Sequence, residues 1–329
     1  MQILIIADPY QATNTASDTG YAFAEEASRR GHFVWWAEPQ HLIYHESVPA
    51  VFAQSLNFTS HGTVGKLSEE KLFFKCAQFD SIWIRKEPPL NPLYVSMCWV
   101  LKSLEKKCLI ANTPSALLNF HEKNIPFMAY QDGFLKKEEI ISSYLFFDIN
   151  TFNLWKSEFE KEHDHLERTW IFKPWRGHGG RGVHKINSFE KLPILLAASE
   201  YQDGFILQEY ISEIEQQGDR RVFVFDGKVC GDFVRLPQEG SFLSNLAQGG
   251  RSDNRIMNEK EKDVSEKIAR YLQKNGIMFA GLDLINGRLN EVNITSPTGV
   301  RPLKEIRGID LSARYVDWVE EKVKALKAV

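Results

Sequence analysis

The sequence predicts an α/β fold in which an N-terminal parallel sheet precedes a longer part built largely from β-hairpins. Two features of the 329 residues carry this prediction. In the first third, short and fully apolar runs alternate with helical patterns, which is typical of a parallel, doubly wound sheet. After about Thr169, β-prone runs come in pairs separated by turns such as Asn286-Gly287, which predicts antiparallel hairpins.

The N-terminal part contains four predicted strands, at residues 3–7, 33–37, 81–85 and 108–112. A helix is expected to begin after Asp18, a typical N-cap residue, and to end just before Gly31. A second helix is expected over 93–107. The turn after the first strand, 7–14, contains no glycine, so we do not expect a dinucleotide pyrophosphate to bind there.

The rest of the chain mixes helical patterns with hairpins. One continuous helical pattern covers 114–131, and others cover 151–164 and 262–275. The predicted hairpins pair residues 169–173 with 182–186, 221–225 with 228–236, and 279–285 with 288–294. The one long stretch of loop composition, 235–254, is expected to hold a binding loop or a lid at 238–250.

Composition excludes several classes of protein. A net charge of −3, with 25% charged and 43% hydrophobic residues, gives no global attraction to nucleic acid or to anionic membranes. No paired or zinc-type spacing connects the cysteines, which are Cys76, Cys98, Cys108 and Cys230. The N-terminus resembles no signal peptide, and no apolar run reaches membrane-spanning length. We therefore expect a cytoplasmic protein with reduced thiols and with neither nucleic-acid nor membrane partners.

Residues 171–186, IFKPWRGHGGRGVHKI, place four glycines in six positions between β-prone runs. A dinucleotide fingerprint or a P-loop leads into a helix, whereas this segment leads into a strand, so we expect a hairpin tip. Glycines permit positive φ and let backbone N–H groups approach an anion, and Lys173 adds a cation. The segment predicts a phosphate cradle, with a plain flexible hairpin as the alternative.

A second constellation consists of Asp283, Glu291 and Asn293, whose oxygen atoms suit Mg²⁺ bound together with nucleotide phosphates. Glu291 and Asn293 are two apart on a predicted strand and so share one face. A simple two-residue turn at Asn286-Gly287 would put Asp283 on the opposite face. A shared metal therefore requires an odd-length loop or a compensating bulge. The alternative is a pair of solvated edge carboxylates.

A third segment, 206–221, runs from an apolar strand into Glu209, Tyr210 and Ile211 and then into a polar turn. An adenine can lie among the apolar side chains and bond to the backbone of 209–211, with Arg221 reaching a phosphate. A solvated turn with a surface ion pair is the alternative.

Further short motifs are spread over nearly the whole chain. They are RKEPP (85–89), HEK (121–123), FKPWRGHGGRGV (172–183), GDRRVFVFDG (218–227), RLPQ with NLAQGGR (235–251), and GLDLI with RLNEVNITSPTG (281–299). In this order they resemble the ATP-grasp superfamily and, in detail, the bacterial glutathione synthetases.

The resemblance implies an ATP-grasp fold preceded by a Rossmann-like domain. It implies an N-terminal substrate domain at 1–118, a central subdomain with the glycine-rich loop at 119–200, and a C-terminal subdomain at 201–329. The implied reaction joins γ-glutamylcysteine to glycine through an acyl phosphate and uses ATP with Mg²⁺, or alternatively Mn²⁺. A homo-oligomer is implied as well. Such chemistry needs positioning and charge stabilisation rather than a protein nucleophile.

The resemblance also implies roles for individual residues. The residues implied to bind ATP are Lys123, Lys173, Gly177, Gly179, Gly180, Gly182, Glu209, Tyr210, Ile211 and Asp219. Metal binding falls to Asp283, Glu291 and Asn293. Arg221, Arg235 and Arg251 are implied to stabilise the γ-phosphate and the acyl phosphate. Substrate binding falls to Asp18, Arg85, Asn245, Ser296 and Thr298. For Arg85 a structural ion pair with Glu87 is the alternative.

The chain departs from the family pattern at several positions. Arg176 stands where the glycine loop usually has Asp, and Leu243 stands where the mobile loop usually has Arg. Glu239 replaces a usual glycine, and Gly299 replaces a common Cys. A ligase with a different γ-glutamyl or amino-acid substrate, and a non-catalytic nucleotide-binding regulator, are therefore the alternative functions.

Overall fold

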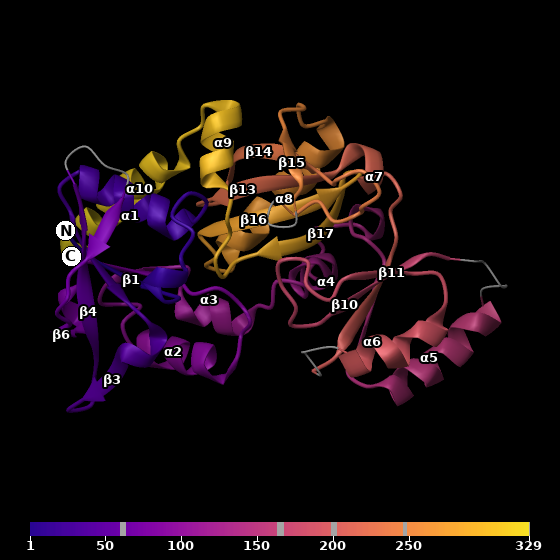
Figure 1. The fold of residues 1–329 in the computed structure, drawn as a ribbon, viewed down its shortest axis with the longest axis horizontal. Coiled ribbons are helices and arrows are strands. Elements are labelled where there is room, and N and C mark those ends of the chain that lie inside the picture. The colour runs from indigo at the N-terminus through magenta and orange to yellow at the C-terminus, as the bar shows by residue number, and fades with distance from the viewer. Residues whose placement is uncertain (60–63, 163–167, 199–202, 246–248, 329) are drawn as a thin grey trace.

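The computed structural model describes residues 1–59, 64–162, 168–198, 203–245 and 249–328. Three β-sheets follow one another along the long axis of the molecule (Figure 1). The sheet built from the N-terminal strands lies at one end of the molecule, and the sheet built from the C-terminal strands lies in the middle. A small sheet, built from strands that lie between these two in sequence, lies at the other end. The predicted fold class is confirmed.

The N-terminal sheet has a parallel centre that matches the four strands expected from sequence. These are β2 (Phe33–Ala37), β1 (Gln2–Ala7), β7 (Ser81–Arg85) and β8 (Leu109–Ala111), in this spatial order. Helices α1 (Thr19–Arg29) and α2 (Pro92–Lys102) belong to this part. The Asp18 side chain accepts a hydrogen bond from the Tyr21 amide (2.6 Å), which confirms the predicted N-cap.

Sequence reasoning missed an antiparallel extension of this sheet. Its strands are β3 (Leu42–His45), β4 (Val48–Phe58), β5 (Gly65–Leu67) and β6 (Leu72–Lys75). Single-turn 3-10 helices occur at η1 (Tyr10–Ala12), η2 (Pro39–His41), η3 (Cys76–Gln78), η4 (Lys137–Glu139) and η5 (Phe189–Lys191). The four cysteines are free, and three of them are buried.

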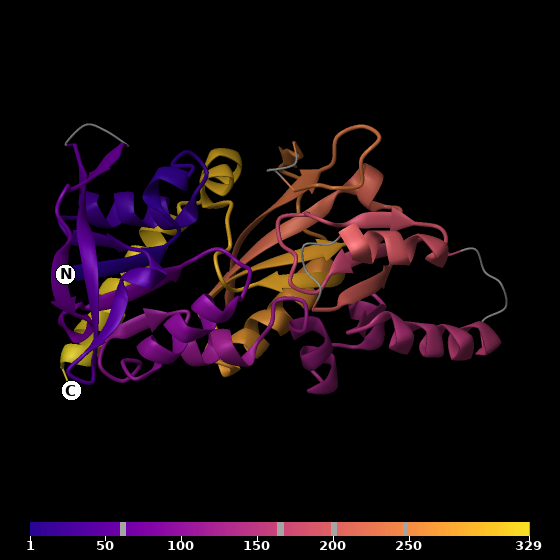
Figure 2. The same ribbon diagram turned by 60° about the horizontal axis from the view of Figure 1, so that its bottom comes forward.

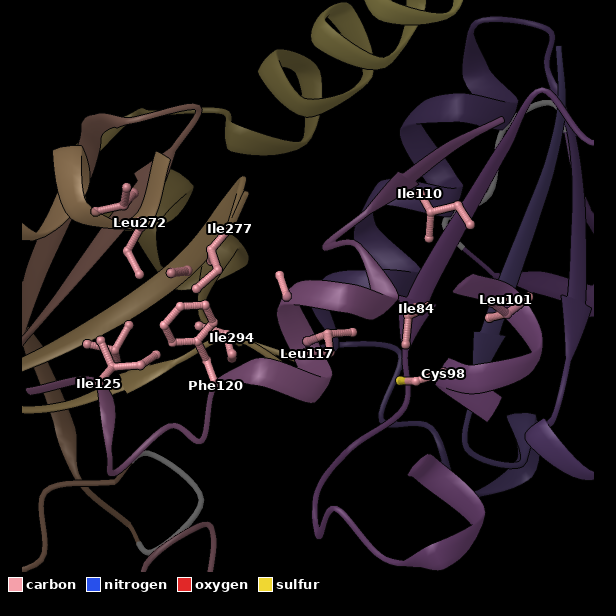
Figure 3. Close-up of a cluster of buried hydrophobic side chains, with 14 of the residues drawn as sticks. Ile84, Cys98, Leu101, Ile110, Leu117, Phe120, Ile125, Leu272, Ile277 and Ile294 are labelled. Carbon is pink, nitrogen blue, oxygen red and sulfur yellow. The ribbon is translucent and has the colours of Figure 1, made fainter. Parts of the chain in front are cut away.

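The continuous helix expected over 114–131 is wrong. The segment forms two helices, α3 (Pro114–Asn119) and α4 (Ile125–Gln131), because Phe120 is extended and Pro126 begins a new helix. Phe120 and Ile125 are buried against the C-terminal part of the chain (Figure 3). The break therefore carries the buried core from the N-terminal sheet to the middle sheet.

The small sheet is antiparallel throughout. Its strands are β11 (His184–Ile186), β10 (Trp170–Pro174), β12 (Phe205–Glu209) and β9 (Ser143–Phe146), in spatial order. The predicted hairpin of β10 and β11 is confirmed. Helices α5 (Ile149–Glu162) and α6 (Leu192–Ala198) lie beside it (Figure 2) and share an aromatic core with it.

The middle sheet contains the other two predicted hairpins. Its strands are β15 (Arg251–Asp253), β14 (Lys228–Leu236), β13 (Asp219–Phe225), β16 (Phe279–Ile285) and β17 (Arg288–Asn293), in spatial order. Its helices are α7 (Ile214–Gln217), α8 (Glu259–Lys274) and α9 (Val300–Arg307).

The last helix, α10 (Leu311–Lys327), returns to the N-terminal sheet, so that both chain ends lie at the same end of the molecule (Figure 1). Tyr315 stacks on Phe23 of α1 with ring centroids 4.1 Å apart. Within the described ranges, no helix is both long and apolar enough to cross a membrane.

Candidate active site

A pocket lies between the small sheet and the middle sheet. The small sheet contributes β10, the glycine loop after it and the end of β12. The middle sheet contributes β13, β14, β16 and β17, and the loop after β14 closes one side. Three segments that were singled out in the sequence, far apart along the chain, therefore meet in one cavity.

The glycine loop needs glycine at several of its positions. Gly179, Gly180 and Gly182 have positive φ values of 61°, 79° and 69°. A Cβ on Gly182 would also lie 2.9 Å from Cγ of Pro174. A plain flexible hairpin would not need this combination, so the loop geometry favours the cradle over that alternative.

The segment before α4 supports this loop from outside. Lys123 is buried, and its Nζ donates to the carbonyl of Gly177. His121 stacks on Trp175, with ring centroids 3.8 Å apart and planes 20° apart. Burial lowers the pKa of His121 to about 3, so the ring that stacks is neutral.

Lys173 is a buried cation between the two sheets. Its Nζ donates to Oε1 of Gln208 and to Oδ1 of Asn290, both at 3.1 Å. Burial lowers the pKa of Lys173 to about 8, with the charge of Lys123 acting in the same direction and the carboxylates opposing it. A bound phosphate would restore the missing opposite charge.

The predicted hinge lies at the wall of the same pocket. Glu209, Tyr210 and Ile211 all line it, at the end of β12. Glu209 is exposed and pairs with Arg288 (3.2 Å), whereas Ile211 is buried. The surface ion pair of the alternative interpretation therefore exists, but it lies beside a pocket.

The bulge required for a shared metal site is present. Ile285 pairs with Arg288 across a two-residue turn, and Asp283 pairs directly with Glu291. The register shifts between these two pairs, so Asn290 is the extra residue on β17. Asp283 and Glu291 therefore share a face, as the metal hypothesis requires.

Asp283 lies at the centre of a buried ion-pair network. It accepts from Arg221 at 2.7 and 3.1 Å, and from Nη2 of Arg235 at 2.8 Å. Arg235 also binds Asp219, with Nε to Oδ1 at 2.8 Å. Burial alone would raise the pKa of Asp283, but the two guanidinium groups outweigh it and lower the pKa. Asp283 is thus an ionised buried carboxylate, which excludes the solvated-edge alternative for it.

The donor set fits a hard cation. Asp283 and Glu291 both line the pocket, and Nδ2 of Asn293 donates to Asp283 (3.1 Å) and to the carbonyl of Gly281 (3.2 Å). Since both amide hydrogens are engaged, the remaining Oδ1 of Asn293 is an acceptor. In the described part of the chain, no three His, Cys, Asp or Glu side chains form a metal cluster, so the candidate consists of two carboxylates and an amide.

Except for Asn245, the predicted substrate residues lie at a second place, around the loop 295–299. Arg85 is buried, and its Nη2 donates to the carbonyl of Pro297 (3.0 Å) rather than pairing with Glu87. Ser296 is buried, whereas Thr298 is exposed and its carbonyl accepts from Arg221 (3.2 Å). Asp18 contributes to the electrostatic environment of Arg85 and caps α1.

Only some of the predicted site residues in the loop between β14 and β15 line the pocket. Asn245 and Leu243 line the pocket. Arg251 is exposed, pairs through its backbone with Leu236, and does not line the pocket. Residues 246–248 of the predicted lid lie outside the described residues.

Arg176, the departure in the glycine loop, points away from the cradle. Its Nη1 donates to the carbonyl of Leu90 (3.2 Å), and its Nε pairs with Asp203 (3.0 Å). It therefore adds no charge over the pocket.

Sequence reasoning missed Glu122, which is buried beside Lys123. Its Oε1 accepts from the amides of Ile294 and Thr295 (2.8 and 3.0 Å) and from the Thr295 hydroxyl (2.8 Å). Glu122 thus fixes the end of β17 and the start of the loop 295–299. A charged residue next to the buried Phe120 and Ile125 was the available signal. Gln208 and Asn290 were missed because nothing in the sequence marks them as partners of Lys173.

Known families cover most of the chain. The family model "Prokaryotic glutathione synthetase, N-terminal domain" matches residues 1–117, and "Prokaryotic glutathione synthetase, ATP-grasp domain" matches residues 154–308. The glutathione synthetase of Neisseria meningitidis is 30% identical, with 98% of this chain and 99% of the relative covered. That of Prochlorococcus marinus is 29% identical, with 96% and 98% covered.

Solved structures share the fold at low sequence identity. The D-alanine–D-alanine ligase of Bacillus anthracis bound to ATP has a TM-score of 0.62 and 15% identity, and covers 100% of this chain and 99% of its own. The D-cycloserine synthetase DcsG has a TM-score of 0.66 and 12% identity, with 98% and 99% covered.

Proposed function

The chain belongs to the prokaryotic glutathione synthetase family, and on this premise we propose that it joins γ-glutamylcysteine to glycine with cleavage of ATP to ADP and phosphate. It is an ATP-dependent carboxylate–amine ligase. The observation that carries the proposal is the single pocket in which the glycine loop and two buried lysines face the carboxylates of β16 and β17.

The nucleotide would lie along this pocket. Its base would contact the hinge at 209–211, and its phosphates would lie under the glycine loop beside Lys123 and Lys173. Mg²⁺ would be held by Asp283, Glu291 and Asn293, where it would neutralise phosphate charge. For the metal to bind, Asp283 would have to release part of its contact with Arg221 and Arg235, which would then face the phosphates.

The substrates would approach from the loop 295–299. Arg85 and the backbone of this loop would hold the dipeptide carboxylate near the γ-phosphate. Attack of that carboxylate on the γ-phosphate would form an acyl phosphate and release ADP, and the glycine amine would then displace phosphate. Each step builds negative charge on oxygen, which Arg221 and Arg235 would stabilise.

The proposal includes the division of the chain. Residues 1–118 would form the substrate domain, 119–200 the central subdomain with the glycine loop, and 201–329 the C-terminal subdomain with the metal residues. A cytoplasmic location is also part of the proposal, and the free, mostly buried cysteines are in keeping with a reducing compartment. We also propose that the protein forms a homo-oligomer.

A related ligase with another carboxylate or amine is the second candidate. Leu243 favours it, because this side chain lines the pocket and places an apolar group where the family usually has a cation. We expect Leu243→Arg to lower the KM for γ-glutamylcysteine and to leave the affinity for ADP unchanged. Gln238→Arg is the matched control, because it adds the same single positive charge at an exposed position of the same loop.

The test is phosphate release from ATP with γ-glutamylcysteine, with and without glycine. Stimulation that requires both substrates, in step with new peptide, supports the proposal. Binding of ATP without stimulation by this pair refutes the assigned substrates. If no carboxylate–amine pair stimulates release, the non-catalytic regulator becomes the better interpretation.

A further inference from the structure

The described part of the loop between β14 and β15 lies against the pocket, although its sequence departs from the family pattern there. Leu236 and Arg251 pair at its base, the Ser241 amide donates to the carbonyl of Gln238 (2.9 Å), and the Gly250 amide donates to that of Asn245 (3.2 Å). The described residues 242–245 all line the pocket. Backbone hydrogen bonds therefore hold the described part of the loop, and residues 242–245 are the part that faces the pocket.

Phe242 enters the apolar end of the pocket. It is half-buried and lies edge-on to Tyr210, with ring centroids 6.3 Å apart and planes at 90°. It packs against a small buried cluster of Ile141, Ile211, Ile214 and Ile285. Since Tyr210 and Ile211 form the hinge, Phe242 lies at the end of the pocket where the base is expected.

The buried charged groups of the pocket contact one another and other polar side chains rather than Phe242. Lys173 contacts Gln208 and Asn290, and Asp283 contacts the arginines of β13 and β14. Among the described residues, the contacts of Phe242 are with apolar and aromatic side chains. The contact of Phe242 with the pocket wall is thus apolar, and it lies at the end of the pocket next to the hinge.

The partner of Phe242 is itself held in place. The Tyr210 hydroxyl donates to Glu215, Nζ of Lys185 lies 3.9 Å from the Tyr210 ring centroid, and Lys185 pairs with Glu215 at 2.9 Å. Two residues, Lys185 of β11 and Glu215 of α7, therefore fix the orientation of this ring. An aromatic side chain packed on it adopts a defined position.

We propose that Phe242 is a nucleobase-binding residue, which forms the loop-side wall of the base pocket opposite the hinge. The proposal rests on the nucleotide site of the proposed function. Every base has a π-face that an aromatic ring can contact, and such contacts are sequence-tolerant and largely independent of charge. Binding of the base would then hold this loop in place before either amino-acid substrate arrives.

The experiment is a calorimetric titration with Mg²⁺-ADP and, separately, with Mg²⁺-tripolyphosphate. Phe242→Ala is expected to weaken ADP binding about tenfold and to leave tripolyphosphate binding unchanged, because only ADP carries a base. Phe242→Leu keeps apolar volume but loses the ring, so its affinity for ADP is expected to lie between those of the wild type and Phe242→Ala. Phe33→Ala is the matched control, since Phe33 is 63% exposed on β2.

The outcomes are separable. Equal ADP affinity in the wild type and in Phe242→Ala overturns the role of Phe242. An equal loss of ADP and tripolyphosphate affinity also overturns it, since that pattern indicates general loosening of the loop. A wild-type protein that binds neither ligand refutes the nucleotide site itself, and with it the proposed function.

Discussion

Glu291 and Asp283 are proposed to hold the same metal, yet the structure gives them different structural roles. Asp283 is 4% exposed and bonds to two buried arginines. Glu291 is half-buried, and among the described residues it forms no ion pair. We therefore expect Glu291→Gln and Asp283→Asn to have similar effects on catalysis and different effects on stability.

The magnitudes follow from the contacts. Removing one partner of a buried ion pair typically costs about 3–5 kcal/mol, because the other charge is left uncompensated. Since a native protein is stabilised by only about 5–15 kcal/mol, Asp283→Asn should be strongly destabilised. Glu291→Gln keeps the shape and uncouples no ion pair, so its free energy of unfolding should change by less than about 1 kcal/mol. Loss of a metal ligand should reduce turnover about 100-fold or more in either variant.

Urea unfolding and Mg²⁺-dependent phosphate release measure the two effects separately. Glu266→Gln, on the exposed face of α8, is the control for loss of a carboxylate. Undiminished turnover in Glu291→Gln at saturating Mg²⁺ would contradict the metal assignment. Wild-type stability in Asp283→Asn would contradict the argument from the buried network.

Three further predictions concern other parts of the site. Since the pKa of Lys173 is lowered to about 8, its ammonium is lost as the pH rises through that value, so calorimetric ADP affinity should fall between about pH 7 and about pH 9. Lys173→Arg should bind with no such step, and a step that persists in it would exclude Lys173 as the cause. Glu122→Ala leaves three buried donors without an acceptor and should lower the free energy of unfolding by about 3–5 kcal/mol in urea, whereas Glu122→Gln should cost about 1 kcal/mol. In phosphate-release assays, Leu243→Arg should lower the KM for γ-glutamylcysteine, and an unchanged KM would show that this position does not sense the substrate.

Local patterns predicted the elements that need only nearby residues. Apolar runs identified β1, β2, β7 and β8, and turn dipeptides identified the hairpins of the middle sheet. The requirement for a compensating bulge followed from strand parity alone. These features were predictable because strand period and turn chemistry are properties of adjacent residues.

Tertiary contacts decided what the sequence did not predict. The helical pattern over 114–131 is broken because Phe120 is extended and its ring packs against the ring of Tyr271 (centroids 6.3 Å apart) on a distant helix. Gln208 and Asn290, the partners of Lys173, lie 35 and 117 residues away from it along the chain, and no local pattern marks them. Periodicity also missed the antiparallel extension β3 to β6, since those strands alternate weakly.

The loop 295–299 connects residues from separate motifs of the proposed active site. Glu122 binds its start through Thr295, Arg85 binds its middle through the Pro297 carbonyl, and Arg221 binds its end through the Thr298 carbonyl. Arg221 also binds Asp283, so the contacts that hold the loop continue directly into the proposed metal site. A change in how Arg221 divides its hydrogen bonds between Asp283 and the loop would therefore affect the nucleotide end and the substrate end together. If the proposed assignments hold, occupancy of the metal and phosphate positions would thereby act on the loop proposed to hold the substrate carboxylate.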